Sequence, residues 1–108
     1  MIVRSWHGAV PIEQGEAFGE YLNETGVAEA KATPGNLGVS ICRRAQNGYE
    51  HFFMVSYWTD FEVIKVFAGP EPDIAVTYPE DADFGLISDP IVLHHEVDRM
   101  QKLPFYQE

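Results

Sequence analysis

Apolar and polar residues alternate roughly over the first ten positions of the chain. Residues 2–10 begin with the apolar pair Ile2 and Val3, and the alternation then runs as far as Val10. Pro11 follows, and its missing backbone N–H cannot join a ladder of hydrogen bonds. The pattern predicts a first strand over residues 2–10.

The period changes to that of a helix from residue 12 onward. Apolar or half-apolar side chains recur at i, i+3, i+4 and i+7, and glutamates occupy the other faces. The first set is Phe18, Tyr21, Leu22 and Thr25, and the second is Glu13, Glu16, Glu20 and Glu24. We expect an amphipathic helix that Gly26 breaks or bends, with a short continuation over residues 27–32 that ends before Pro34-Gly35.

A β-hairpin is predicted around Asn47-Gly48. Both centres of a two-residue type I′ turn need a positive φ, and these two residue types tolerate it best. The strand before the turn alternates over residues 37–42. The strand after it, residues 50–58, is apolar or aromatic at both odd and even positions, which indicates that both of its faces are buried.

A second helix is predicted to follow Trp58. Thr59 and Glu62 have the spacing of a capping box with Thr59 as N-cap, and Trp58 and Val63 have that of a hydrophobic staple. Gly69-Pro70 ends the helix, because neither residue type continues one.

The remainder of the chain divides into an irregular segment and a strand. Residues 70–90 contain four prolines but also regularly placed apolar side chains. We expect one or two short helical turns there, packed by those side chains rather than disordered. A last strand is predicted over residues 91–97.

The order strand, helix, strand, strand, helix, strand predicts an α+β domain of ferredoxin-like βαββαβ type. With right-handed crossovers, the four strands form an antiparallel sheet. From one edge to the other, the order of its strands is 91–97, 2–10, 50–58 and 37–42. Two helices cover only one face, although residues 50–58 present apolar side chains to both. We therefore expect a homodimer through the sheet faces.

Composition limits the partners. With 7 Lys and Arg against 17 Asp and Glu, the net charge is −10, so we expect no nucleic-acid and no membrane partner.

The lone cysteine, Cys42, fits a reducing compartment and is expected to be a small buried residue. No secretory signal is visible, which predicts a cytoplasmic protein. The length of 108 residues fits one domain, residues 1–98, and a C-terminal tail, residues 99–108.

Five short segments stand in an order and spacing that agree with this fold. They are Ile2-Val3-Arg4-Ser5-Trp6, Pro34-Gly35, Tyr57-Trp58-Thr59-Asp60, Phe67-Ala68-Gly69 and His94-His95-Glu96-Val97. Over residues 1–98 the chain therefore resembles the antibiotic-biosynthesis-monooxygenase-like family of dimeric α/β-barrel proteins. The resemblance implies a dimeric barrel and one of two activities, cofactor-independent insertion of O₂ into activated aromatic polyketides or haem degradation.

The resemblance disfavours haem degradation. The haem-degrading branch uses a Trp late in the second helix, a His about ten residues beyond it and an Asn on the first strand. Here the corresponding places hold Phe67 and then Thr77 or Tyr78, and residues 2–10 contain no Asn. The histidine that would be the proximal ligand of the haem iron is therefore missing. His94 or His95 can take its place only if the pocket is reorganised.

No metal site is expected from the histidines. Adjacent His94 and His95 point to opposite faces of a strand, and His7 and His51 have no ligand partner at i+2 or i+4. No nucleophile triad and no phosphate-binding loop is visible either. The remaining chemistry is that of aromatic and imidazole side chains.

A cofactorless oxygenase has to deprotonate an acidic phenol or enol, hold the anion in an apolar cavity and admit O₂. Histidine is the natural base, and Tyr or Trp side chains are natural positioners. We therefore predict His94 and Tyr78 as catalytic residues, Trp6, Trp58 and Phe67 as substrate-binding residues, and no resident cofactor. Each also has a plain structural interpretation as packing or as a satisfied sheet histidine.

The predicted function is thus cofactor-independent monooxygenation of a small aromatic, quinol-type substrate. The alternative is a non-catalytic small-molecule-binding or stress-associated dimer of the same fold, in which the aromatic residues are core. A haem-binding protein that does not degrade haem is a third possibility. A continuous cavity touching His94 and Tyr78 favours an enzyme or a binder, and solid packing favours a structural role.

Overall fold

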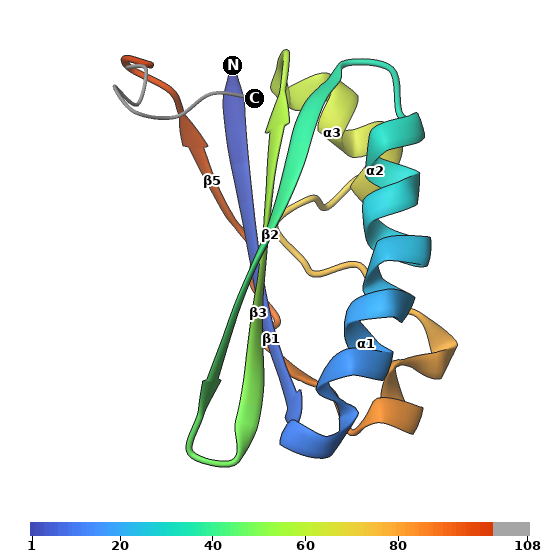
Figure 1. The fold of residues 1–108 in the computed structure, drawn as a ribbon. Coiled ribbons are helices and arrows are strands. Elements are labelled where there is room, and N and C mark those ends of the chain that lie inside the picture. Colours follow the sequence, from blue (N-terminus) through green and yellow to red (C-terminus); the bar gives the residue numbers. More distant parts are fainter. Residues whose placement is uncertain (101–108) are drawn as a thin grey trace.

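The computed structural model describes residues 1–100 as a sheet with helices on one face (Figure 1). The strands are β1 (Ile2–Pro11), β2 (Asn36–Gln46), β3 (Tyr49–Trp58), β4 (Ile87–Ser88) and β5 (Leu93–Glu96). The helices are α1 (Gly15–Leu22), α2 (Ala28–Ala32) and α3 (Phe61–Ala68), with 3₁₀ turns at Ile12–Gln14 and Pro79–Phe84 and a π-helical turn at Asn23–Val27. The expected tail from residue 101 onward lies outside the described residues.

The sheet has the predicted order. β1 pairs antiparallel with β3 along its whole length, β2 pairs with the other edge of β3, and β5 pairs with the free edge of β1. The two-residue strand β4 extends that same edge of β1 further along, and it was not predicted because two residues carry no periodicity. The ferredoxin-like α+β fold is therefore confirmed.

The first helical segment is one column built from several turn types. The π-helical turn that joins α1 to α2 contains Gly26, the residue predicted to break or bend this helix. Gly26 is buried close to Leu22 and Met54, so the column approaches β3 closely there. The predicted hairpin is also confirmed, since Asn47 and Gly48 have φ values of 54° and 81°.

Helix α3 begins one residue later than its sequence pattern predicts. Its N-cap is Asp60, whose Oδ1 accepts a hydrogen bond from the Val63 N–H at 3.1 Å. The capping box with Thr59 as N-cap is therefore wrong. Thr59 instead donates its own N–H to the Gly35 carbonyl at 2.9 Å, which holds it beside the start of β2. The carboxylate of Asp60 is the stronger acceptor at the positive end of a helix.

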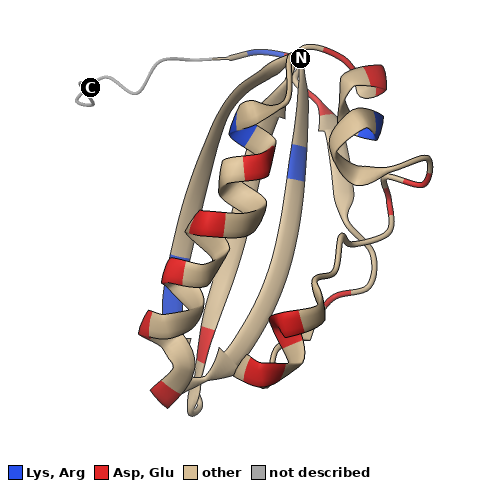
Figure 2. Ribbon diagram, turned by 90° about the vertical axis from the view of Figure 1, so that its right-hand side faces the viewer, with Lys and Arg blue, Asp and Glu red and all other residues tan. Residues whose placement is uncertain are grey.

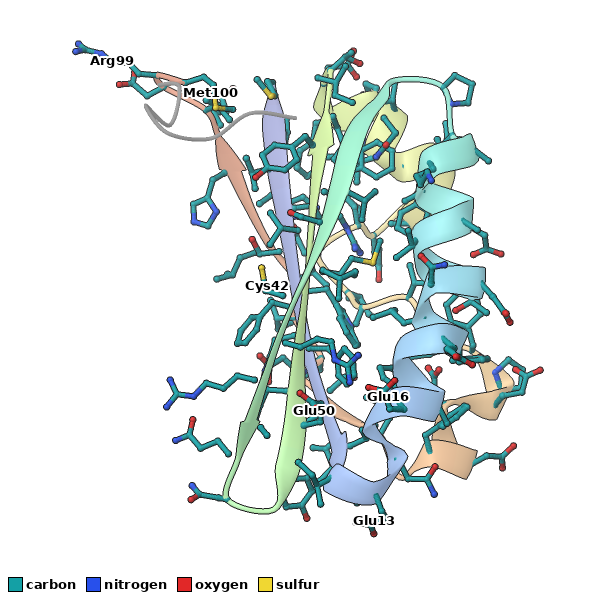
Figure 3. All side chains as sticks on the ribbon, viewed as in Figure 1. Glu13, Glu16, Cys42, Glu50, Arg99 and Met100 are labelled. Carbon is teal, nitrogen blue, oxygen red and sulfur yellow. The ribbon has the colours of Figure 1, made fainter. Side chains whose placement is uncertain are left out.

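Alternation along the strands divides the sheet into a covered and an open face. Ile2, Arg4 and Trp6 of β1 face the helices and are buried, as are Met54 and Trp58 of β3. The open face carries the exposed apolar side chains Phe53, Ile87 and Leu93. Cys42 is exposed and points away from the helices (Figure 3), so its expected burial is wrong within this single chain.

Acidic residues recur along the helical column (Figure 2). They are the glutamates that the helical period assigned to the outer face, and in the structure they are exposed. No helix within residues 1–100 is long and apolar enough to cross a membrane.

A glycine substitution tests the junction of α2, β2 and α3. Gly35 has a φ of 95°, and a Cβ there would lie 2.8 Å from both methyl carbons of Val63. Gly35→Ala is expected to lower the free energy of unfolding by about 3 kcal/mol. The control Gly38→Ala, which meets nothing within 4 Å, should change it by less than about 1 kcal/mol. Urea unfolding measures both, and equal effects would refute this account of the junction.

Candidate functional site

A small cavity lies between the helical layer and the sheet, with a volume of about 30 Å³. Strand β1 contributes Arg4 and Trp6 to its wall, β3 contributes Met54, and α3 contributes Phe67. The other lining residues are Phe18, Tyr21, Leu22, Thr25 and Gly26 of the helical column and Val76, Tyr78, Asp81 and Leu86 of the irregular segment. This volume holds about one water molecule, so a larger ligand requires the wall to move.

The indole of Trp6 depends on the glycine two residues further along β1. A Cβ on Gly8 would lie 2.6 Å and 2.7 Å from two carbons of the Trp6 ring and 2.9 Å from Leu86 Cδ1. Any larger residue at this position would displace the indole or the irregular segment that packs over it. Gly8 therefore sets the position of one aromatic wall of the cavity.

Arg4 is the cation of the cavity, and only 2% of the residue is exposed. One Nη donates to the Pro72 carbonyl at 3.5 Å, and the guanidinium carbon lies 5.4 Å from the centre of the Phe67 ring. Nε has no hydrogen-bond partner within residues 1–100. Burial lowers the pKa of Arg4 from 12.5 to about 10, which still leaves it positively charged at neutral pH.

Tyr78 lies on the irregular segment and closes the cavity from that side. Its hydroxyl donates to a carboxylate oxygen of Glu29, and its backbone N–H donates to Asp81 at 2.9 Å. Burial, together with the bond to Glu29, raises the pKa of Tyr78 well above its usual range. The phenol is therefore protonated at neutral pH and acts as a hydrogen-bond donor, not as a base.

His94 lies one strand away from the cavity wall, opposite Arg4 in the pairing of β5 with β1. Its Nδ1 is 2.9 Å from Asp73 Oδ1, and its Nε2 is buried without a partner among the described residues. Burial, and next the positive charge of Arg4, lower the pKa of His94. A neutral ring that donates from Nδ1 to Asp73 leaves a lone pair on Nε2.

The hollow at His94 is separate from the cavity. Its lining residues are Ile2, Phe61, His94, His95 and Glu96, and its volume is about 160 Å³. The irregular segment contacts residues of both spaces, because Pro72 accepts the bond from Arg4, Asp73 binds His94, and Tyr78 closes the cavity. A displacement of this segment would therefore affect both spaces together.

Trp6, Phe67 and Tyr78 of the predicted site residues thus line one cavity, and two others do not. Trp58 is fully buried behind Phe67, with ring centres 5.5 Å apart, and its indole N–H donates to Ser56 Oγ at 2.9 Å. His94 occupies the neighbouring hollow.

Arg4 was missed by reasoning from the sequence. The signal was present in the alternation of the first strand, since Arg4 shares its parity with Ile2 and Trp6 and so had to face the core. A charged residue on the buried side of a strand is uncommon and identifies a candidate functional position.

A second polar cluster lies on the open face of the sheet. His7 Nδ1 is 3.1 Å from Asp89 Oδ2, and His7 Nε2 is 3.0 Å from His51 Nδ1. The two imidazole planes differ by 4° with centres 5.2 Å apart, so the rings meet edge to edge around one N–H···N hydrogen bond. Phe53 packs on His7 at 4.6 Å. Only the pairing of β1 with β3 brings the two histidines together.

The sheet, the one-sided helical layer and the aromatic cavity between them define the class: the chain has the fold of antibiotic-biosynthesis-monooxygenase-like proteins. A Deinococcus radiodurans protein provisionally named as such a monooxygenase matches with a TM-score of 0.65 at 14% identity, over 95% of this chain and 98% of that one. A Bacillus cereus protein of the same provisional name gives 0.63 at 17%, over 99% and 98%.

The haem degrader MhuD of Mycobacterium tuberculosis, solved with two haems in its active site, also shares the fold. Its TM-score is 0.61 at 20% identity, over 94% of this chain and 100% of that one. No protein-family sequence model and no functionally curated protein matches the sequence. The resemblance inferred from the sequence is confirmed at the level of the fold.

The cavity residues do not fit a haem. Within residues 1–100, no histidine lines the cavity, so its wall offers haem iron no imidazole ligand. Phe67 and Tyr78 lie on its wall, and neither the Phe67 ring nor the Tyr78 hydroxyl, which is bonded to Glu29, offers a nitrogen ligand to iron. The chemistry of the site is therefore that of an aromatic pocket with one cation.

The lowered pKa of His94 predicts a pH dependence of stability. The unfolded chain, with a pKa near 6.5 at this residue, binds the proton more readily than the folded chain. The stability that His94 contributes is therefore present above that value and is lost as the pH falls through its folded-state pKa. The free energy of unfolding of His94→Gln should fall less than that of the wild type between neutral pH and about pH 5.

Urea unfolding at several pH values measures this difference. The matched control is Val66→Gln, which introduces the same side chain at a residue that is 74% exposed on α3 and removes no titratable group, so it should keep the wild-type pH dependence. An unchanged slope in His94→Gln would show that burial does not disfavour the charged ring.

Proposed function

We propose that this protein is a cofactor-independent monooxygenase acting on a small aromatic, quinol-type substrate. The observation that carries the proposal is the cavity in which Trp6, Phe67 and Tyr78 form aromatic walls beside the buried cation of Arg4. Apolar walls with a few convergent polar groups are the general form of a small-molecule site. The shared fold is an analogy that agrees with the proposal but does not determine the chemistry.

The proposed reaction balances without a cofactor. A methylene carbon activated by an adjoining phenol or enol loses one proton, and the resulting carbanion reacts with O₂ to give a hydroperoxide on that carbon. Loss of water from the hydroperoxide leaves a carbonyl group. One oxygen atom remains in the product and the other leaves as water with both hydrogens, so the substrate supplies all four electrons.

His94 is the proposed base for the first proton. Its Nδ1 faces the carboxylate of Asp73, which orients the ring, and its buried Nε2 is free to accept. Tyr78 is the proposed positioning residue at the opposite side of the cavity, where its ring forms part of the wall while its hydroxyl stays bonded to Glu29. The segment of residues 72–78 contacts Arg4 and His94 and carries Tyr78, so its displacement by a substrate would connect the cavity with the His94 hollow.

Oxygen uptake tests the function. Purified protein with a panel of anthrone-type and quinol-type compounds should consume O₂, and His94→Gln should lower kcat by about 10²-fold or more. Val66→Gln, which introduces the same side chain at a residue that is 74% exposed on α3 and lines neither space, is the control and should keep full activity. Tyr78→Phe should mainly raise KM. If no compound in the panel supports uptake, or if His94→Gln is as active as the wild type, the proposed reaction or its base is refuted.

A non-catalytic binding protein is the second candidate. It is favoured by the separation of the two spaces, because the cavity that Tyr78 lines does not reach His94, the proposed base. The same panel of anthrone-type and quinol-type compounds separates the two functions, because a binding protein would bind some of them without consuming O₂.

We also propose that the protein is a homodimer that buries the open face of the sheet against the same face of a second copy. Phe53, Ile87 and Leu93 are 42%, 63% and 59% exposed on that face. Apolar side chains gathered on one sheet face are costly to leave in water, and a self-complementary interface removes them from it.

Light scattering tests the dimer. The wild type should have about twice the 12.2 kDa mass of the chain at micromolar concentration. Phe53→Glu should be monomeric, because it places a charge in the centre of the proposed interface. The control Val66→Glu alters an equally apolar residue that is 74% exposed on α3, and it should remain dimeric. A monomeric wild type would exclude this interface.

A further inference from the structure

We infer that Arg4 binds the anionic oxygen of the ligand, so that the cavity accepts an aromatic phenolate or enolate in preference to its neutral form. The inference rests on the proposed function for the kind of ligand, an aromatic molecule with an ionisable oxygen. It adds the charge state in which that ligand is bound and the residue that selects it.

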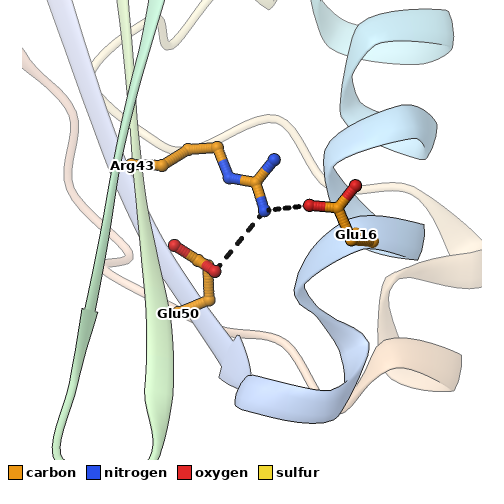
Figure 4. A network of polar contacts seen from close by, with 3 residues as sticks. All are labelled: Glu16, Arg43 and Glu50. Atoms are coloured by element: carbon orange, nitrogen blue, oxygen red, sulfur yellow. Dashed lines mark hydrogen bonds and ion pairs between the residues drawn. The ribbon is translucent and has the colours of Figure 1, made fainter.

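The surroundings of Arg4 differ from those of the paired arginine on the same side of the sheet. Arg43 binds Glu16 at 3.2 Å and Glu50 at 3.4 Å (Figure 4). Arg4 is far more buried, yet it makes no ion pair with any residue in the described part of the chain. Burial lowers the pKa of Arg4 and the charge of the Asp73 carboxylate opposes this shift from a distance, but this carboxylate is 2.9 Å from His94 and makes its ion pair there.

The lack of an ion pair at Arg4 is informative because of the composition of the chain. It contains 17 acidic residues and carries a net charge of −10, so carboxylates are abundant. A buried cation without a directly bonded counter-ion is costly, and a protein that needed Arg4 only for its fold would gain by pairing or replacing it. The unpartnered Nε, buried at the cavity wall, is the donor that an incoming anion would satisfy.

The walls of the cavity select the kind of anion. The ring of Phe67 lies against the guanidinium, and Trp6, Phe18 and Tyr78 supply further aromatic surface. Nε is the one buried donor of Arg4 without a partner among the described residues, which suits one oxygen, whereas a carboxylate or a phosphate would need two or more donors. A single charged oxygen on an aromatic ring matches both the donor set and the apolar walls.

Bound phenolate chemistry follows from this placement. In a poorly hydrated cavity the positive charge of Arg4 stabilises the ionised form of a phenol or enol much more than water does. The bound ligand therefore favours its ionised form. For a ligand that enolises, this enolate is a resonance form of the carbanion that reacts with O₂ in the proposed function, and the proton goes to the proposed base His94. Arg4 would thus assist the base rather than replace it.

Two probes of equal shape test the inference without turnover. 4-Nitrophenol forms a coloured anion, and 4-nitroanisole is the same ring with an uncharged methyl ether. The wild type should bind the phenolate about tenfold or more tightly than the ether, and the pKa of bound 4-nitrophenol should fall by about one unit or more. Absorption titration against pH measures both quantities.

Substitutions locate the effect. Arg4→Met should abolish the preference for the phenolate, and Arg4→Lys should keep part of it because the charge remains without the planar fork. Arg43→Met removes an equal charge outside the cavity and should behave as the wild type. Arg4→Met should also melt at or above the wild-type temperature, because it replaces an unpaired buried cation with an apolar side chain.

Three results would overturn the inference. They are equal binding of phenolate and ether by the wild type, an undiminished preference in Arg4→Met, and selective binding of 4-nitrobenzoate in place of 4-nitrophenol. If Arg4→Met does not fold, Arg4→Lys and the two probes on the wild type decide.

The outcome is separable from that of the proposed function. A protein that selects the phenolate but consumes no O₂ with any quinol keeps this inference and refutes the oxygenase. If the protein consumes O₂ and Arg4→Met consumes it equally fast, the oxygenase is supported and the role of Arg4 is refuted.

Discussion

Strand β1 has hydrogen-bonded neighbours on both edges, with β3 along its whole length on one side and β5 and β4 on the other. This central position fixes the face on which each side chain of the strand lies, because side chains alternate between the two faces and the pairing on both edges fixes the register. Arg4 and Trp6 are thereby placed under the helices, and His7 is placed on the open face. The cavity and the open face are two sides of one strand.

The unfavourable free energy of burying Arg4 is offset by the packing of apolar side chains around it. The fully buried side chains Phe18, Trp58 and Ile64 belong to one continuous core that includes the cavity wall. Burial of each large apolar side chain is worth about 2 kcal/mol, whereas an unpaired buried charge costs several. The fold can therefore sustain one unfavourable position, and such positions are where proteins give up stability for function.

Two Asp–His pairs lie on opposite faces of the sheet and differ in their surroundings. Asp73 and His94 lie on the covered face, where burial and Arg4 favour the neutral imidazole. Asp89 and His7 lie on the open face, where His51 continues the chain of hydrogen bonds. The same pair of residue types thus gives a candidate base on one side and a polar element of the proposed dimer face on the other.

The sequence by itself determined the order of the main elements, the hairpin at Asn47-Gly48 and the end of α3 at Gly69, because each depends on local backbone preference or on side-chain period. It also determined the order of the strands in the sheet, because crossover connections are right-handed. It also identified Trp6, Phe67 and Tyr78 as candidates for one site. Only the tertiary structure separated His94 from that cavity, moved the cap of α3 to Asp60, joined His7 to His51 and left Arg4 without a carboxylate. These depend on which segments meet across the sheet, and contacts between residues distant in the chain leave no periodic signal in it.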